Sequence, residues 1–374
     1  MKVLHGRVTR LLSVGIALLG LGLVSMPATA SAAVPFTDTV VQAWGVNGVV
    51  RATAIAGDTV VVGGTFTAAV SPTGVSIDRR NLAAFSLSTG ELLTGWRADT
   101  DNTVSALGTD GSSVWAGGTF TTVGGTARSR LVKLDAVTGA VDPNFSPRVN
   151  NGVKAVEVAG ADLFIGGAFS AVDGVSRKRL AKLHAGTGAL DAQFAASADK
   201  PVYALALSST GTLFVSGTFT LLNGVARLGV GGVNAITGAI SGPAFAFTSV
   251  PVYGLDVSPD GVMLFGAQKS NQLTAWTVAS GSRKWRVNTD GNAQAVKYFA
   301  DTVYFGFHDG YQGDTTLKLL AVDPSTGAVD PSFKPAINSF YGVFAIDASA
   351  GGLVVGGTFT KVSGVSARRV AIFH

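Results

Sequence analysis

Short runs of β-branched and aromatic residues alternate along the chain with turns rich in glycine, threonine and Asx residues. The runs at residues 153–158, 163–168, 179–184 and 189–194 show the pattern clearly, because turn residues bound each of them. Runs of this length and composition predict β-strands. The sequence therefore predicts an all-β fold, with four strands in each unit of about 50 residues.

Landmarks that recur at regular intervals define these units. A glycine, in one unit a serine, ends the second strand: Gly63, Gly117, Gly166, Ser216, Gly266, Gly306 and Gly356. A turn that ends in glycine follows the third strand: Gly90, Gly139, Gly188, Gly238, Gly281 and Gly327. An aromatic residue follows most of these turns: Trp96, Phe145, Phe194 and Phe333. We expect the glycines to allow close approach and tight turns, and the aromatics to pack one unit against the next.

The first landmark occurs seven times and the second six times, and the difference falls at the ends of the chain. The last unit stops at His374, where its third strand should end, whereas residues 40–44 resemble the fourth-strand segment at residues 140–145. Four strands per unit of about 50 residues is typical of a β-propeller. We therefore predict a seven-bladed β-propeller in which residues 34–48 form the outer strand of the last blade and close the ring.

The first 33 residues have the pattern of a secretory signal peptide. Lys2, Arg7 and Arg10 precede an apolar run over residues 11–24, and small residues at 28–33 offer cleavage sites. The run is shorter than the roughly 20 residues that a membrane-spanning helix needs. We expect Sec-type export, a mature propeller at residues 34–374 without a membrane span, and a secreted or surface-associated location.

Composition narrows the classes of function. The chain of 374 residues has no cysteine, which excludes disulfides, cysteine-ligated zinc, iron–sulfur clusters and a thiol nucleophile. Removal of the predicted signal leaves 25 basic and 23 acidic residues, because three of the 28 basic residues lie in it. A net charge of +2 gives no electrostatic reason to expect nucleic acid as a partner.

Motifs for catalysis or metal binding are few. His184, His308 and His374 lie in different units and form no H-E-x-x-H or H-x-H pair. The sequence contains no G-x-S-x-G, G-x-G-x-x-G or P-loop pattern. Asp256 and Asp347 occupy equivalent first-strand positions, and we expect them to be solvated or turn-bonded rather than a catalytic pair. We predict no catalytic residue, metal site or cofactor.

Charged loop residues leave two questions open. Residues 99–102 and 288–292 could offer oxygen ligands to calcium, but neither matches an EF-hand, so Asx turns are favoured. Arginines in the loops between second and third strands either bond to groups of their own repeat or form a ring that binds an anionic glycan or carboxylate. These arginines are Arg79, Arg80, Arg128, Arg130, Arg177, Arg179, Arg227, Arg368 and Arg369.

One position in the first strand of each unit varies while the next residue is always small. In a propeller the first strands line the axial channel, so this position would lie at the channel mouth. Aromatic and cationic groups around a concavity can bind a sugar or a peptide, with packing between blades as the alternative. Apart from Ser105, the residues at this position form the predicted ligand-binding site: Arg51, Lys154, Tyr203, Tyr253, Gln294 and Phe344.

The repeat resembles a known family through its GGTFT, V-x-G-x-x-x-R and T-G-A-V-D-x-x-F segments. These segments lie in residues 113–147, 162–194 and 353–371 and resemble the delta-60 repeat family of β-propellers and, more distantly, the Rax2-type repeats of fungal cell-polarity proteins. Residues 272–285 of the fifth unit look more like a quinoprotein-type repeat. The resemblance implies a secreted or surface propeller, commonly bacterial, and no particular reaction.

The predicted function is a secreted, monomeric binding or scaffold module for an extracellular glycan, peptide or protein at the channel mouth. Two alternatives stay open. One is a quinoprotein-like or other propeller enzyme, which would need a cofactor pocket with charged or metal-ligating groups. The other is a structural component of the cell surface or of adhesion.

Overall fold

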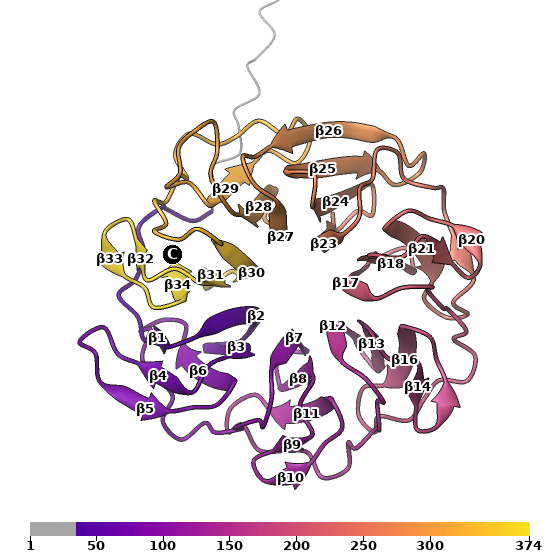
Figure 1. Ribbon diagram of the computed structural model, residues 1–374, viewed down its shortest axis with the longest axis horizontal. Coiled ribbons are helices and arrows are strands. Elements are labelled where there is room, and N and C mark those ends of the chain that lie inside the picture. The colour runs from indigo at the N-terminus through magenta and orange to yellow at the C-terminus, as the bar shows by residue number, and fades with distance from the viewer. Residues whose placement is uncertain (1–34) are drawn as a thin grey trace, which may run out of the picture. The chain divides into compact units, whose positions relative to one another are not determined.

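A computed structural model describes residues 35–374, which fold entirely into β-strands, turns and loops, as predicted (Figure 1). The predicted signal peptide lies outside the described residues. The sheets are arranged around a central axis, each with one innermost strand (Figure 1). These strands are β2 (Val49–Ala56), β7 (Val104–Thr109), β12 (Val153–Ala159), β17 (Val202–Leu207), β23 (Val252–Val257), β27 (Ala293–Phe299) and β30 (Val343–Ser349). Each contacts the next in order, and β30 also contacts β2.

Every innermost strand begins an antiparallel sheet that runs outwards. The second strands are β3 (Thr59–Thr65), β8 (Ser113–Gly118), β13 (Asp162–Gly167), β18 (Thr212–Gly217), β24 (Met263–Gln268), β28 (Thr302–Phe307) and β31 (Gly352–Gly357). The third strands are β6 (Leu82–Ser86), β11 (Leu131–Asp135), β16 (Leu180–His184), β21 (Val230–Asn234), β25 (Gln272–Thr277), β29 (Leu319–Val322) and β34 (Val370–Phe373). The first three strands of the predicted unit are therefore confirmed.

The fourth strand is shorter than predicted in most units. Only β22 (Ile240–Ser241) and β26 (Arg283–Asn288) extend a described sheet to four strands, whereas Leu190 pairs with Leu183 through a single bridge. The reason is a turn that follows at once: the Asp191 carboxylate accepts hydrogen bonds from the backbone N–H groups two and three residues later. Such an Asx turn bends the chain away from the sheet.

The N-terminal segment joins the last unit to the first. Val40 bridges to Phe373, and the Val41 N–H donates to the Ile372 carbonyl at 2.8 Å. Immediately afterwards β1 (Gly45–Val46) pairs with β4 (Ala68–Val70). Residues 34–48 were predicted as one outer strand of the last unit, but their ladder contact there is a single bridge, and their second half belongs to the first unit.

Small hairpins connect the second and third strands in several units. Besides β4 with β5 (Ser76–Asp78), they are β9 (Thr122–Val123) with β10 (Thr126–Ala127), β14 (Ala171–Val172) with β15 (Val175–Ser176), β19 (Leu221–Leu222) with β20 (Val225–Ala226), and β32 (Lys361–Val362) with β33 (Val365–Ser366). The fifth and sixth units have no such hairpin among the strands described.

The landmark glycines lie where neighbouring units approach each other most closely. A Cβ on Gly117 would lie 2.5 Å from a methyl of Val153 in the next unit. A Cβ on Gly139 would lie 2.8 Å from the ring of Trp96, a residue only 1% exposed. The landmark aromatics therefore pack beneath the glycine turn of the following unit, which confirms the predicted role of both landmarks.

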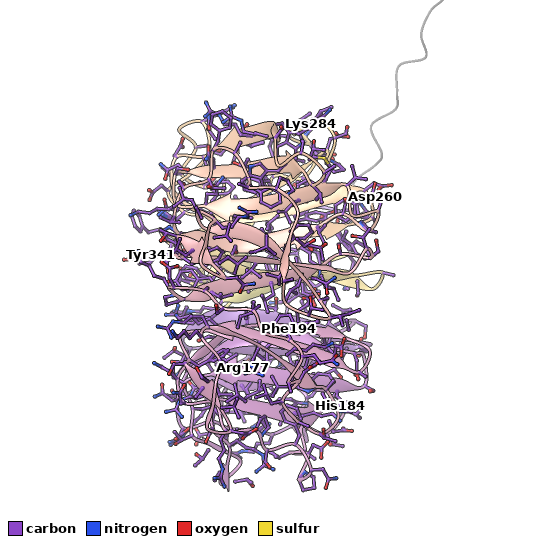
Figure 2. All side chains as sticks on the ribbon, turned by 90° about the vertical axis from the view of Figure 1, so that its right-hand side faces the viewer. Arg177, His184, Phe194, Asp260, Lys284 and Tyr341 are labelled. Carbon is purple, nitrogen blue, oxygen red and sulfur yellow. The ribbon has the colours of Figure 1, made fainter. Side chains whose placement is uncertain are left out.

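The described residues present two different faces. Figure 2 places Tyr341 and Arg177 towards one face and His184 and Asp260 towards the other. The first face, called the mouth face here, carries the connections between units and the small hairpins. Innermost strands start at this face, so the first residues of each strand surround the entrance to the channel.

Candidate ligand-binding site

All six predicted site residues, together with Ser105, line one cavity of about 320 Å³ at the mouth face. We call these seven the mouth residues. Arg51 and Lys154 are exposed, and the other members are half-buried. The structure therefore brings these side chains together, and their role in binding a ligand stays a prediction.

A β-bulge at the start of each innermost strand explains why these side chains converge. The pairing of β2 with β3 passes from Val50 directly to Ala52, so that Arg51 has no partner across the ladder. The same irregularity lies at the other mouth residues: Ser105, Lys154, Tyr203, Tyr253, Gln294 and Phe344. Because a bulged residue is unpaired and its side chain is re-aimed, each strand delivers one side chain to the same cavity.

The small residue after each bulge is required by the spacing of the innermost strands. A Cβ on Gly254 would lie 3.2 Å from the Ala295 Cα of the neighbouring strand. Ala52, Ala106, Ala155 and Ala345 are likewise buried. The mouth thus combines two kinds of position. The residue after each bulge is always small because the packing of the strands requires it, whereas the bulged residue varies and faces the cavity.

One side of the mouth is a row of stacked groups. The Lys154 ammonium lies 5.1 Å from the centre of the Tyr203 ring, in the range of a cation–π contact. The Tyr203 and Tyr253 rings are nearly parallel, with an interplanar angle of 6° and centroids 6.2 Å apart. Burial and the nearby Tyr203 raise the pKa of Tyr253, so the Tyr253 phenol is a neutral donor at physiological pH.

The opposite side of the mouth holds an amide and further aromatics. With its nitrogen towards the backbone, the Gln294 amide donates to the carbonyls of Tyr341 at 2.9 Å and Val343 at 3.0 Å. These bonds fix the entry of β30, which carries Phe344 into the cavity. Phe340 and Tyr341 precede this strand and are 65% and 57% exposed, an unusual degree for neighbouring aromatic side chains.

A second layer of charged side chains lies deeper in the same channel. Glu157, Asp256, Lys297 and Asp347, called the inner cluster here, line a cavity of about 320 Å³. An intermediate cavity shares lining residues with both the mouth and this layer. Each inner-cluster residue follows its own mouth residue by three positions, so the two layers are successive levels of the innermost strands.

The carboxylates of the inner cluster bond to the backbone of the neighbouring unit. Asp347 accepts from the Ile55 N–H at 2.9 Å, and Asp256 accepts from the Tyr298 N–H at 2.8 Å. Glu157 makes the longer equivalent bond, of 3.4 Å, to the Leu207 N–H. These N–H groups lie on the free edge of an innermost strand, which has no further strand to pair with.

Charges within the inner cluster compensate one another incompletely. Lys297 pairs with Asp347 at 3.0 Å, and this carboxylate raises the pKa of Lys297. Burial raises the pKa of Asp256. Burial, with the neighbouring charge of Asp256, raises the pKa of Glu157 to about 7.

The sequence anticipated this cluster only in part. Asp256 and Asp347 were expected to be solvated or turn-bonded, but each bonds to the strand of the next unit, because its side chain faces that strand's free edge. Glu157 and Lys297 were missed. The sequence does contain a signal for these residues, which is their shared register: all four stand three positions after the variable mouth position of their own strand.

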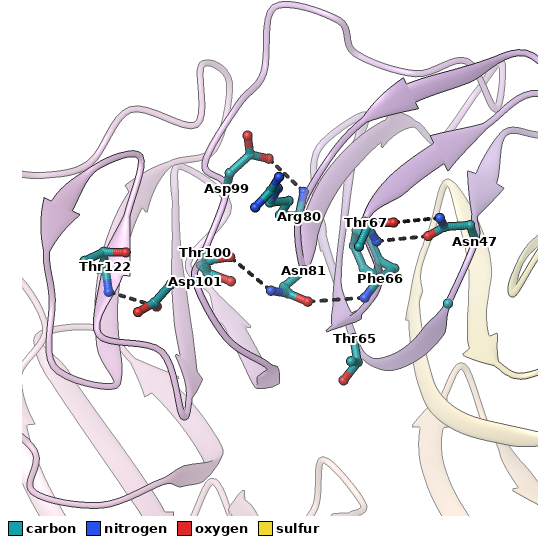
Figure 3. A pocket seen from close by; sticks show the side chains of 11 residues that line it. Asn47, Thr65, Phe66, Thr67, Arg80, Asn81, Asp99, Thr100, Asp101 and Thr122 are labelled. Carbon is teal, nitrogen blue, oxygen red and sulfur yellow. Dashed lines mark hydrogen bonds between the residues drawn. The ribbon is translucent and has the colours of Figure 1, made fainter.

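A larger cavity of about 580 Å³ lies on the mouth face between the first two units (Figure 3). Its polar groups are already engaged with one another. Asp101 accepts from the N–H groups of Thr121 and Thr122, and Asp99 accepts from the N–H of Arg80. Asx turns were expected at residues 99–102, but the carboxylates of Asp99 and Asp101 instead cap backbone N–H groups about 20 residues away in the sequence. Within residues 35–374, no group of three or more His, Asp or Glu side chains is placed to hold a metal ion.

Several of the loop arginines donate hydrogen bonds to backbone carbonyls of their own repeat. Arg128 donates to the carbonyls of Ala127 at 2.8 Å and Asp142 at 3.1 Å, and Arg177 makes the equivalent pair of bonds. Arg79 and Arg227 repeat the pattern. The first of the two alternatives for these arginines, bonding within the repeat, is therefore confirmed for these positions.

Comparisons with known proteins agree on the architecture. Residues 114–145 and 163–194 match a family model described as a domain of unknown function (DUF5122) β-propeller. No curated protein matches the chain in sequence. None of the chain's described residues forms a helix that is long and apolar enough to cross a membrane.

Three solved structures are similar to this chain in shape but distant from it in sequence. U3-55K matches with a TM-score of 0.62 at 11% identity, covering 90% of this chain and 97% of its own. The WD40 β-propeller domain of Doa1 matches with a TM-score of 0.59 at 12% identity, covering 91% of this chain and 96% of its own. The computationally designed Ika8 protein matches with a TM-score of 0.54 at 14% identity, covering 91% of this chain and 99% of its own. At these identities the similarity shows the fold alone, and the chain is a β-propeller.

Proposed function

We propose that this protein is a secreted, non-catalytic binding or scaffold module that holds an extracellular glycan or peptide at the mouth of its axial channel. One observation carries the proposal: a bulge at the same place in each innermost strand turns a different side chain into one cavity. A constant scaffold that varies only the exposed position is how repeat folds build recognition surfaces.

The proposed architecture is a ring of seven blades closed by the N-terminal segment. Support comes from the contact of β30 with β2 and from the bonds of Val40 and Val41 to the last strand. Deleting residues 34–44 removes those bonds, so we expect a lower and broader thermal unfolding transition. Unchanged unfolding of the shortened protein would refute closure by this segment.

The proposed location outside the cell rests on the sequence of residues 1–33, with cleavage before a mature chain of 34–374. Expression of the full chain in a bacterial host with an active Sec pathway should release a protein whose N-terminus lies near residue 34. Retention of the whole chain inside the cell would contradict this part of the proposal.

Binding is tested most directly at the stacked tyrosines. We would compare wild-type protein with a Tyr203→Ala, Tyr253→Ala double variant on glycan and peptide arrays. We expect the double variant to lose the signals of the wild type, and a Tyr203→Phe, Tyr253→Phe variant, which keeps both rings, to retain most of them. Equal binding by wild type and the alanine variant would place the site elsewhere.

A further inference from the structure

Two positive charges at the mouth have no acidic partner. Lys133, Lys182 and Lys297 each pair with an aspartate and Lys318 donates to two backbone carbonyls, whereas exposed Lys284 is in no ion pair within the described residues. Arg51 and Lys154 line the mouth together and form no ion pair or hydrogen bond within residues 35–374. Partial burial and the charge of Arg51 lower the pKa of Lys154, which means that the two cations repel each other.

The carboxylates deeper in the channel form no ion pair with Arg51 or Lys154 within the described residues and bond to other groups instead. Asp347 binds Lys297 and the Ile55 N–H, and Asp256 binds the N–H groups of Val257 and Tyr298. No acidic residue is among the seven that line the mouth. An anionic group from outside the protein would therefore meet two unpaired cations, one of them a guanidinium that matches the geometry of a carboxylate.

The stacked tyrosines lie beside these cations and offer a flat apolar surface. A six-membered sugar ring has one face of C–H groups that packs well on an aromatic ring, and its hydroxyls can bond to phenol groups at the edge. Because Lys154 lies over the Tyr203 ring, a sugar seated on Tyr203 would bring an acidic substituent close to the ammonium.

A peptide fits the site less well. One recurring mode of peptide binding adds a strand to a free sheet edge. In this channel the free N–H groups of Ile55, Leu207 and Tyr298 are capped by the carboxylates of the inner cluster. A ligand at the mouth is therefore recognised by side chains and not by backbone groups. Phe340 and Tyr341, which are exposed at the rim, supply a second aromatic surface for a neighbouring sugar unit.

We propose that the mouth binds an acidic oligosaccharide, with a sugar carboxylate held by Arg51 and Lys154 and the ring of that sugar stacked on Tyr203. This inference rests on the proposed binding function and names its ligand class. It assigns distinct roles within one cavity: the cations select the acidic group, and the tyrosines bind the sugar whether or not it is charged.

The test uses uronate- and sialate-bearing oligosaccharides, each paired with its own methyl ester, which keeps the sugar and removes the charge. We expect the full mature protein to bind an acid at least about tenfold more tightly than its ester. Arg51→Gln and Lys154→Met should reduce the affinity for the acid to that for the ester, without changing the affinity for the ester. Lys284→Met, which removes an exposed charge outside the mouth, should change neither.

Outcomes that overturn the inference differ from those that overturn the proposed function. Equal binding of acids and esters, both lost in the double Tyr203→Ala, Tyr253→Ala variant, would leave a glycan-binding mouth but refute carboxylate selection. Binding of acidic peptides alone would refute the sugar class. Binding of neither glycan nor peptide to wild-type protein would refute the binding function itself.

Discussion

The mouth residues and the inner cluster are neighbouring layers of one channel, three positions apart on the same strands, and they use charge in opposite ways. In the inner cluster, Lys297 is paired with Asp347, and the carboxylates bond to the strand of the next unit. At the mouth, Arg51 and Lys154 have no such partner within the described chain. One layer thus holds the units together, while the other leaves its charges available.

This difference follows from backbone geometry. At the bulge the chain leaves the ladder, so a side chain there can change without disturbing a pairing. Three positions later the strand is regular, and a side chain faces the free N–H groups of its neighbour. Equivalent charges should therefore affect stability in the inner cluster and ligand binding at the mouth.

Replacement of Lys297 by methionine should produce the largest loss of stability. It leaves Glu157, Asp256 and Asp347 facing one another without a cation, and we expect a cost of about 3 kcal/mol at pH 8, the lower end for breaking a buried pair because Lys297 is 32% exposed. At pH 5 the cost should be smaller, since protonation relieves the repulsion. Urea unfolding at both pH values measures the effect.

The matched control is Lys154→Met, the same substitution in the other layer. It breaks no ion pair, so its free energy of unfolding should stay within about 0.5 kcal/mol of the wild-type value. Similar losses in the two variants would mean that the layers do not differ in the way described.

The pH dependence of stability should distinguish Glu157 from the other glutamate of the chain. Because the pKa of Glu157 is raised to about 7 in the folded protein, the folded state binds more protons than the unfolded state between its ordinary pKa and about pH 7. This contribution to stability is complete at low pH and is lost as the pH rises through 7. Glu157→Gln keeps an acceptor for the Leu207 N–H and cannot ionise.

We therefore expect Glu157→Gln to match the wild type at pH 4 and to be more stable by about 2 kcal/mol at pH 8. Glu91→Gln is the control, since it makes the same substitution at an exposed position outside the inner cluster. A pH profile of Glu157→Gln parallel to that of the wild type would show that folding does not raise the pKa of Glu157.

Sequence alone was sufficient for the features that recur in every unit. Landmark glycines and aromatics located the strands, because close packing demands them at fixed intervals, and the variable position located the mouth. The sequence did not predict the bulge at the start of each innermost strand, because a bulge depends on how two strands pair. It also overestimated the fourth strand, where the Asp191 carboxylate caps a turn directly after Leu190.

The inner cluster was harder to predict because its contacts cross between units. Glu157 and Asp256 are about 100 residues apart in sequence, yet the charge of one affects the other. No local motif records such a contact. Only the shared register on the innermost strands indicates it, and Lys297 has the opposite charge to the residues it joins, which hides the pattern from a search for similar residues.

The smallest expected effect concerns the repulsion between Arg51 and Lys154. Since partial burial and Arg51 lower the pKa of Lys154, its charged form is slightly unfavourable in the folded protein. Lys154→Met should therefore increase stability slightly in about 10 mM salt, by less than about 0.5 kcal/mol, and the part of this gain that comes from Arg51 should vanish near 0.5 M salt, where the screening length is only a few ångströms. Thermal unfolding across this salt range measures it. A gain that is independent of salt would mean that burial, and not Arg51, disfavours the charge of Lys154. A loss that shrinks on adding salt would mean that Lys154 pairs with an anionic group in the folded chain.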